Sequence, residues 1–466
     1  MKCAFYESDI TPPLYLNMPG YFSERPAQTV KDKIYAKAVL FRGLCSEGSG
    51  ADSMSSVSSS GQSEERTIAM VSIDANFITE DMVTRIKERI CEHTDINEQD
   101  ITVSATHLHN AGPTVEWGKF VKKDDIYISY VCDKAADAVI IAENNLKPAN
   151  LRYGNGYLST ISFNRIYKMK NGTLQTNPGK YNPDIVEPSG GIDPDVTVMY
   201  CEDKSGKPMG CITNFACHQD CVDEYVYSGD YSSRLSDRLK EKFGHEFVSH
   251  FVLGTCGNIN HFDVKTDKDT VPEYYRVMGD ALADEVFKTI DKSEPVADSG
   301  LSVRSAVLIL KKREVENDVE TEIAELEKTV KFNSGEVIGS QSDPDKLKLV
   351  FDYDLRNYLK DKNPVKNVPV KFFRVGDAAF YSLPGEVFME YGREIKDKSP
   401  YYKNFIITNS NGLFGYIPLR DYFMPTVYES RLGSTSYLEP EAGEKITDAA
   451  LAMAEDAFAQ DGSCRN

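Results

Sequence analysis

The chain lacks the segments that would place it in or across a membrane. No run in its 466 residues approaches the roughly 18 consecutive apolar residues that a membrane-spanning helix requires. Residues 1–9 have neither the basic start nor the apolar core of a secretory signal. We therefore expect a protein without stable membrane association, located in the cytoplasm.

Positive charge is also scarce, and the cysteines are scattered. The 53 Lys and Arg residues are outnumbered by 72 Asp and Glu residues, which gives a formal net charge of −19. Because such a surface repels nucleic-acid phosphates and anionic lipids, neither is expected as a partner. The 10 cysteines follow no disulfide-framework spacing, so reduced thiols are expected.

Strand-like and helix-like patterns alternate along the chain. Helical spacing of apolar residues predicts a helix over residues 80–90, with Thr79 as its N-cap, and further helices over 125–145, 274–290 and from about 386. Apolar runs predict strands at 34–41, 67–73, 101–104, 195–201, 211–216, 247–253, 368–375 and 378–383. This mixture predicts an α/β fold in which mixed β-sheets are flanked by helices.

Two segments read as insertions rather than as domain boundaries. Residues 46–65 are rich in Gly and Ser and predict a flexible loop between two strands. Residues 315–331 carry the Glu/Lys pattern of a solvated helix, and 346–359 can pair with it, so a helical insertion is expected at about 315–362. No repeat or linker divides the chain, and a single catalytic domain over residues 1–466 is predicted.

Histidine is rare, and three of the 7 histidines lie in two short motifs. His107 and His109 are two residues apart, so in an extended chain their side chains share a face, with Cα atoms about 6.5–7 Å apart. His218 ends a second apolar run. The alternative to a metal role is a structural pair at a strand end for His107 and His109. For His218 it is a core histidine hydrogen-bonded to a backbone carbonyl. A Cys217/Cys221 metal site is disfavoured, because no second cysteine pair completes it.

Two further motifs add oxygen ligands. Glu386 follows Pro384-Gly385. The alternative to a ligand role is that its carboxylate only complements the dipole of a helix that begins there. Tyr428 precedes Glu429, where a buried tyrosine with a bonded hydroxyl is the alternative. Two imidazoles and a carboxylate leave an open coordination position on zinc. A water bound there has its pKa lowered from about 15.7 towards about 7. Together the motifs predict a metal-dependent hydrolase with one Zn²⁺ per chain.

With these motifs identified, the chain resembles the N-terminal catalytic domain of the neutral/alkaline, non-lysosomal ceramidase family. The likeness covers nearly the whole chain, and the order and spacing of many short motifs make it specific. The motifs are Ser8-Asp9-Ile10-Thr11-Pro12-Pro13, Thr106-His107-Leu108-His109, Phe163-Asn164-Arg165, Asn214-Phe215-Ala216-Cys217-His218, Ser228-Gly229-Asp230-Tyr231, Gly254-Thr255-Cys256-Gly257-Asn258-Ile259-Asn260, Pro384-Gly385-Glu386 and Tyr428-Glu429.

The resemblance implies a role for each site residue. It implies that the zinc ligands are His107, His218, Glu386 and a tyrosine, which we assign to Tyr428, with Tyr422 as the alternative. It also implies that His109 and Arg165 contact the substrate, His109 at the carbonyl.

The chain departs from the family pattern at one motif and at its end. Ceramidases carry Gly-Asp-Val-Ser-Pro where this chain has Gly257-Asn258-Ile259-Asn260-His261. Asn258 and Asn260 are expected to line the pocket, but asparagine cannot shuttle a proton. Another carboxylate must then act as the base, and Asp230 and Asp263 are the candidates by motif. The sequence also ends without the immunoglobulin-like module of the ceramidases, which favours a substrate smaller and more polar than ceramide.

The sequence therefore predicts a zinc-dependent amidohydrolase that cleaves an amide, or an ester, in a small polar N-acyl-type molecule. Two alternatives remain at this stage. A catalytically degenerate homologue that only binds ligands is favoured by the two asparagines at 258 and 260. A metal-free serine hydrolase is disfavoured, because the chain contains no Gly-x-Ser-x-Gly motif.

Overall fold

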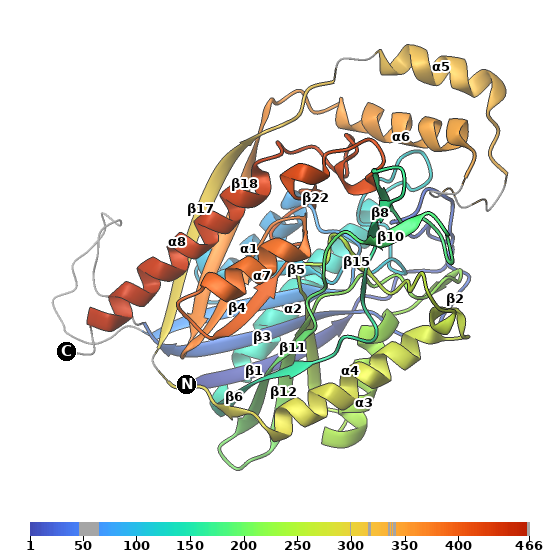
Figure 1. The fold of residues 1–466 in the computed structure, drawn as a ribbon. Coiled ribbons are helices and arrows are strands. Elements are labelled where there is room, and N and C mark those ends of the chain that lie inside the picture. Colours follow the sequence, from blue (N-terminus) through green and yellow to red (C-terminus); the bar gives the residue numbers. More distant parts are fainter. Residues whose placement is uncertain are drawn as a thin grey trace.

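The structure, a computed structural model, describes residues 1–45, 65–298, 300–315, 318–333, 336, 338 and 342–463. Within these residues the chain forms eight α-helices and several β-sheets (Figure 1). The expected mixed α/β class is confirmed. The flexible loop predicted at 46–65 lies outside the described residues, except that Glu65 is the first residue of a strand.

A nine-stranded sheet forms the centre of the molecule. Two pairs, β12–β14 and β4–β5, are parallel, and the other neighbours are antiparallel. The strands β5 and β12 lead directly into the two histidine motifs. The order is β14 (Val248–Leu253), β12 (Pro208–Phe215), β11 (Asp195–Asp203), β6 (Lys147–Tyr157), β1 (Lys2–Asp9), β3 (Tyr35–Leu44), β4 (Glu65–Ile73) and β5 (Ile101–Ala105), with β16 (Glu294–Pro295) beside β6.

A second sheet packs on one face of the first. Its order is β17 (Leu301–Lys311), β18 (Val365–Val375), β19 (Ala378–Ser382) and β21 (Lys403–Ile407). In β4, Ile68 and Met70 pack towards this second sheet, whereas Ala69 and Val71 pack towards helices. Both faces of β4 are therefore buried, which is why its sequence is a continuous apolar run.

Helices cover the outer faces of both sheets, so the fold has four layers in the order α–β–β–α (Figure 1). The nine-stranded sheet is covered by α1 (Glu80–His93), α2 (Asp125–Asn144), α3 (Asp230–Phe243) and α4 (Tyr274–Asp291). The second sheet is covered by α7 (Met389–Lys398) and α8 (Ala442–Ser463). The predicted cap of α1 is confirmed, since the Thr79 side chain accepts from the Met82 amide.

The predicted helical insertion forms a pair of helices at one end of the molecule, beyond the sheets (Figure 1). Helix α5 (Val319–Thr329) and helix α6 (Pro344–Tyr358) bury Ile323 and Leu349 against each other. The face of α6 that carries Phe351 contributes to the cavity described below. The prediction of a single domain over the whole chain is not tested by these contacts and stays a prediction.

The helix expected to begin near Glu386 begins later, at Met389. Instead, β20 (Glu386–Val387) pairs in parallel with β22 (Tyr416–Ile417). The amide of Glu386 donates to the carbonyl of Gly415 at 2.8 Å. The expected helix start at Glu386 was wrong because this backbone pairing joins segments about thirty residues apart. The local sequence does not predict such a pairing.

Short ladders and 3₁₀ turns complete the fold. They are β2 (Thr29–Val30) with β13 (Val226–Tyr227), β7 (Phe163–Asn164) with β15 (Ile259–Asn260), the three strands β8 (Ile166–Met169), β9 (Leu174–Thr176) and β10 (Ile185–Pro188), and the 3₁₀ turns η1 (Glu98–Asp100), η2 (Lys268–Thr270), η3 (Arg420–Tyr422) and η4 (Tyr428–Ser430).

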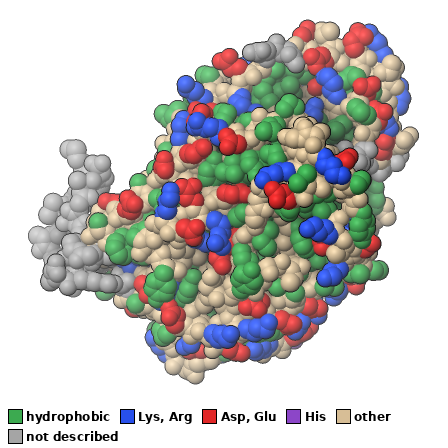
Figure 2. All heavy atoms as spheres, in the orientation of Figure 1, with side chains coloured by type: hydrophobic (Ala, Val, Ile, Leu, Met, Phe, Trp, Pro, Cys, Tyr) green, Lys and Arg blue, Asp and Glu red, His purple; other side chains and the backbone are tan. Residues whose placement is uncertain are grey.

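The visible surface is mixed in character. Acidic, basic and apolar side chains are interspersed over the face shown in Figure 2. Among the described helices, none combines the length and the apolar character needed to cross a bilayer.

Candidate active site

The loops that follow β5 and β12 lie side by side and bring the two histidine motifs together. Leu108 and Gln219 form a parallel bridge, and the amide of His109 donates to the carbonyl of Gln219 at 3.0 Å. As a result the imidazole rings of His107 and His218 have their centroids 4.6 Å apart. Two motifs that are more than one hundred residues apart in sequence therefore form one cluster.

The β20–β22 ladder adds a carboxylate to this cluster. Oε2 of Glu386 lies 3.1 Å from Nε2 of His107 and 3.3 Å from Nε2 of His218. The three side chains are nearly inaccessible to solvent. The predicted grouping of His107, His218 and Glu386 is thus present in the structure.

Backbone carbonyls fix the tautomers of both imidazoles. Nδ1 of His107 donates to the carbonyl of Asn76 at 3.1 Å, and Nδ1 of His218 donates to that of Ile259 at 2.9 Å. In each neutral ring, Nε2 then carries a lone pair. Burial and the nearby Arg165 cation lower the pKa of His218 to about 4, so this ring is neutral at pH 7.

The carboxylate of the cluster lies without a hydrogen-bond donor of its own among the described residues. Glu386 lies opposite the two Nε2 lone pairs. Its two oxygens accept no hydrogen bond from the part of the chain that the structure describes. Tetrahedral zinc with bonds of about 2.0–2.1 Å separates its ligands by about 3.3 Å. The observed 3.1 and 3.3 Å match that separation, so this donor set fits a metal ion.

The third histidine of the cluster has a ligand atom within 4.8 Å of those of His107 and His218. Nε2 of His109 lies 3.3 Å from Nε2 of His107 and is the donor in that contact, because the His107 atom carries the lone pair. Burial, together with His107, lowers the pKa of His109 well below its usual value. His109 is therefore a neutral ring that points an N–H group at the cluster.

Arg165 is held by a buried carboxylate. Its Nε donates to Glu429 at 2.6 Å, and its Nη2 donates to the carbonyl of Gly257 at 2.6 Å. The remaining Nη1 donates to Nε2 of His218 at 3.2 Å, and this bond must break if a metal takes that lone pair. Because Glu429 neutralises its charge, Arg165 has little capacity left to attract an anion.

Two tyrosines border the cluster, and sequence reasoning missed one of them. Tyr428, the predicted zinc ligand, lines the cavity, and its ring lies 5.6 Å from that of Tyr416. Tyr416 is the ladder partner of Glu386, and no spacing in the sequence marks it. Burial raises the pKa of both phenols. The alternative ligand Tyr422 donates to the carbonyl of Ser189 at 3.1 Å and does not line the cavity.

The two asparagines expected in the pocket make structural hydrogen bonds instead. Asn258 donates to Glu390 and accepts from the Met389 amide, both at 2.9 Å, which ties it to the start of α7. Asn260 donates to Asn177 at 3.1 Å. Neither asparagine is among the described residues that line the cavity, although Asn177 is.

The two carboxylates predicted as candidate bases also lie outside the cavity lining. Asp230, whose pKa burial raises to about 6, accepts the Cys221 amide at 2.8 Å and so holds the loop behind His218. Asp263 accepts the Lys265 amide at 2.9 Å in a turn. Asp220 is the carboxylate that does line the cavity, and sequence reasoning passed over it.

The cluster opens into a cavity of about 430 Å³. Its base carries the polar groups of the cluster, and one wall is apolar, with contributions from the loop around Phe22 and from helix α6. The described residues that line it are Gly20, Tyr21, Phe22, His109, Arg165, Gln175, Thr176, Asn177, His218, Asp220, Ile338, Leu347, Phe351, Tyr416, Pro425, Thr426, Tyr428 and Arg431.

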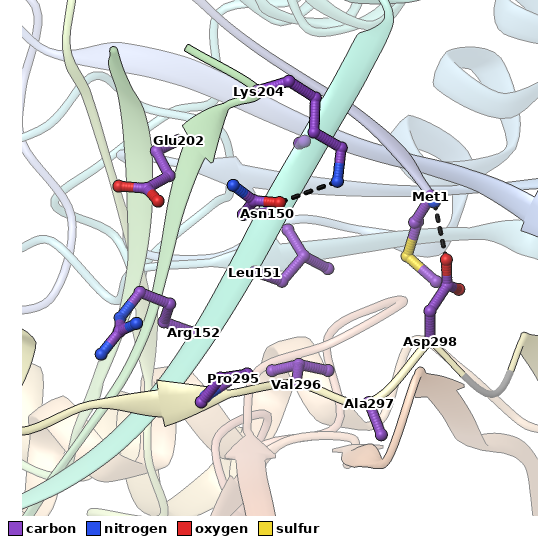
Figure 3. Close-up of a pocket in the computed structure, with 11 residues that line it drawn as sticks. Met1, Asn150, Leu151, Arg152, Glu202, Lys204, Pro295, Val296, Ala297 and Asp298 are labelled. Atoms are coloured by element: carbon purple, nitrogen blue, oxygen red, sulfur yellow. Dashed lines mark hydrogen bonds and ion pairs between the residues drawn. The ribbon is translucent and has the colours of Figure 1, made fainter. Parts of the chain in front are cut away.

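A second cavity, of about 260 Å³, lies at the N-terminus and is drawn in Figure 3. The amino group of Met1 pairs there with Asp298 at 2.8 Å, and Lys204 donates to Asn150 at 2.7 Å. The described residues of its lining include no histidine, cysteine or tyrosine. The histidine cavity is therefore the candidate active site.

Comparisons with known proteins identify the fold. The neutral ceramidase from Pseudomonas aeruginosa matches with a TM-score of 0.69 and 17% sequence identity, over 98% of this chain and 74% of that chain. A structure described as a ceramidase complexed with C2 matches with a TM-score of 0.67 and 16% identity, over 97% of this chain and 74% of that chain. No family model and no curated protein matches the sequence. The chain thus has a ceramidase-like fold, as the sequence motifs predicted.

Proposed function

We propose that this chain is a zinc-dependent hydrolase that cleaves an amide, or an ester, in a small N-acyl-type substrate through an activated water. The observation that carries the proposal is the arrangement of His107, His218 and Glu386. Three buried electron-pair donors approach to 3.1 and 3.3 Å without a proton donor that satisfies the carboxylate. The ceramidase-like fold is consistent with this chemistry.

His107, His218, Glu386 and Tyr428 would hold one zinc ion. When bound, zinc supplies Lewis-acid activation of the carbonyl and of the attacking water. Since the phenol of Tyr428 has a raised pKa before metal binds, its coordination would require a proton to leave. Backbone carbonyls hold both imidazoles by Nδ1, which turns each Nε2 towards the cluster.

His109 and Arg165 would act around the reacting carbonyl. The N–H of His109 points into the cluster and would donate to the oxyanion that develops during attack. Arg165, which is held by Glu429, would shape the wall of the cavity beside His218 rather than attract a substrate charge.

The proton acceptor would be Asp220 rather than Asp230 or Asp263. Among the described residues of the cavity lining, Asp220 is the carboxylate, and its Oδ1 accepts from Nδ1 of His261 at 3.0 Å. That bond occupies one of the two carboxylate oxygens. A carboxylate within reach of an attacking water can accept its proton.

Metal analysis of the purified protein tests the proposal. We expect about one zinc per chain, and loss of that zinc in a His107→Ala/His218→Ala double variant. A His245→Ala variant is the matched control, because His245 is an exposed histidine in the part of the chain that the structure describes. We also expect chelator-sensitive release of amine from members of an N-acyl library. Protein without zinc, or zinc retained in the double variant, would remove the basis of the proposal.

The alternative of a degenerate homologue that only binds ligands rested on Asn258 and Asn260. Neither asparagine is among the described residues that line the cavity, whereas the carboxylate Asp220 is. The same assays separate the two functions. Stoichiometric zinc with no hydrolysis of any amide or ester in the library would favour the degenerate homologue.

A further inference from the structure

Three charged residues line the cavity, apart from the histidines, and two of them are already paired. Arg165 is bound to Glu429, and Asp220 is bound to His261. The third, Arg431, has no ion pair or side-chain hydrogen bond among the described residues. In a chain with 72 acidic and 53 basic residues, a cation without a carboxylate partner is notable.

The position of Arg431 is nonetheless fixed by its surroundings. Its guanidinium lies 3.8 Å from the ring centroid of Phe351, on the apolar wall of the cavity. Its amide donates to the carbonyl of Tyr428 at 3.0 Å, directly after the turn η4. The aromatic contact orients the planar group but leaves the N–H groups on its edge without acceptors.

No neighbouring carboxylate balances this charge. Asp352 acts on Arg431 electrostatically, but it accepts the ammonium of Lys348 at 2.7 Å. Burial therefore lowers the pKa of Arg431 with little compensation. A half-buried guanidinium without a partner is costly, and a bound anion would relieve that cost.

We propose that Arg431 forms a carboxylate-binding subsite, so that the substrate is an N-acyl compound that carries a carboxylate as well as the scissile bond. This inference rests on the proposed function for the bond that is cleaved. A single guanidinium binds a carboxylate in bidentate geometry. The other arginine of the cavity is committed to Glu429.

Matched ligand pairs test the subsite at either end of the substrate. One pair is N-octanoylglycine and N-octanoylglycinamide, and the other is the monoamide of suberic acid and its methyl ester. Dissociation constants would be measured by calorimetry, and kcat/KM by amine release, on the zinc-loaded protein.

Arg431→Gln removes the charge, and Arg431→Lys keeps it. Arg420→Gln is the control, because Arg420 is half exposed and pairs with Glu441 at 3.4 Å outside the cavity.

We expect the wild-type protein to bind the carboxylate member of at least one pair about 10-fold or more tightly than its neutral partner. This preference should fall to about 2-fold or less in Arg431→Gln, persist in part in Arg431→Lys and remain unchanged in Arg420→Gln. If Arg431→Gln does not fold, Arg431→Met, which keeps the stem beside Phe351, gives the same measurement.

The outcomes for the subsite and for the hydrolase are distinguishable. Equal binding of both members in both pairs, or a preference that survives Arg431→Gln, overturns the subsite. Hydrolysis without a carboxylate preference leaves the hydrolase standing while the subsite fails. Binding of the carboxylate that depends on Arg431, without any hydrolysis, supports the subsite and contradicts the hydrolase.

Discussion

In the proposed mechanism, Asp220 serves catalysis and not metal binding. It lines the cavity, yet it is not one of the atoms of the His107, His218 and Glu386 cluster. Its Oδ1 is held by Nδ1 of His261 at 3.0 Å, which fixes the orientation of the carboxylate. A substitution here is therefore expected to change turnover and not zinc content.

We expect Asp220→Asn to lower kcat at least 100-fold, because the amide keeps the shape of the side chain but cannot accept a proton at neutral pH. Zinc content should remain at about one per chain. Asp223→Asn, at an exposed acidic residue three positions further along, is the control. A decrease of less than about threefold in kcat for Asp220→Asn, with zinc present, would rule out this assignment.

At the scale of elements, the two-residue ladder between β20 and β22 decides where Glu386 points. Gly385, which precedes it, has φ +69°, and a Cβ at this position would lie 2.4 Å from the carbonyl oxygen of Gly415. The same carbonyl accepts the amide of Glu386. A side chain at 385 therefore displaces the strand that carries the carboxylate.

We expect Gly385→Ala to destabilise the protein by about 2 kcal/mol or more and to weaken zinc binding at least 10-fold, since it adds a steric clash to the backbone strain. Gly206→Ala isolates the strain, because Gly206 has φ +85° and nothing within 4 Å of a new Cβ. The control should lose about 1 kcal/mol and keep its zinc affinity. Thermal unfolding measures the change in stability, and competitive zinc titration measures the change in zinc affinity. Equal zinc affinity in both variants would contradict the role given to the ladder.

At the scale of the whole molecule, the buried histidine of β14 couples stability to pH. His250 is fully inaccessible, and neither ring nitrogen has a hydrogen-bond partner in the described part of the chain. Burial lowers its pKa to about 3. The unfolded chain takes up this proton near pH 6.5, whereas the folded protein does not until about pH 3. Its contribution to stability is therefore fully present above pH 6.5 and is lost as the pH falls towards 3.

We expect this residue to account for about 2 kcal/mol of the stability lost between pH 7 and pH 5. Urea unfolding of the wild-type protein and of His250→Leu at both pH values measures it, because the variant should lose about 2 kcal/mol less over that interval. His245→Leu, at an exposed histidine, should behave as the wild type does. An equal loss in wild type and His250→Leu would show that His250 does not titrate in this way.

Residue types and local spacing were enough to predict several of these features. The pattern of Met82, Val83, Ile86 and Ile90 predicts α1, since helical periodicity is local. The rarity of histidine concentrates attention on His107 and His218, which do meet. The motif order also predicts the ceramidase-like fold, which the structural comparisons confirm. The roles assigned to the individual site residues stay predictions until metal and activity are measured.

Other features depend on contacts between distant segments. Tyr416 reaches the site only because β22 pairs with β20, and Asn258 leaves the cavity lining because it bonds to the start of α7. Asp220 lines the cavity and Asp230 does not, although both lie near His218 in the sequence. Local patterns carry no record of such pairings.

The sequence by itself determined which imidazoles and carboxylates are present. It also determined the pattern of strands and helices and the excess of negative charge. Only the tertiary structure decided which of these groups share a cavity, which arginine pairs with Glu429 and which one has no ion pair among the described residues. The physical reason is that periodicity and capping act within one element. Ion pairs and metal-ligand clusters, in contrast, form only when side-chain atoms lie within a few ångströms of each other. The residues that carry these atoms are up to several hundred positions apart in the sequence.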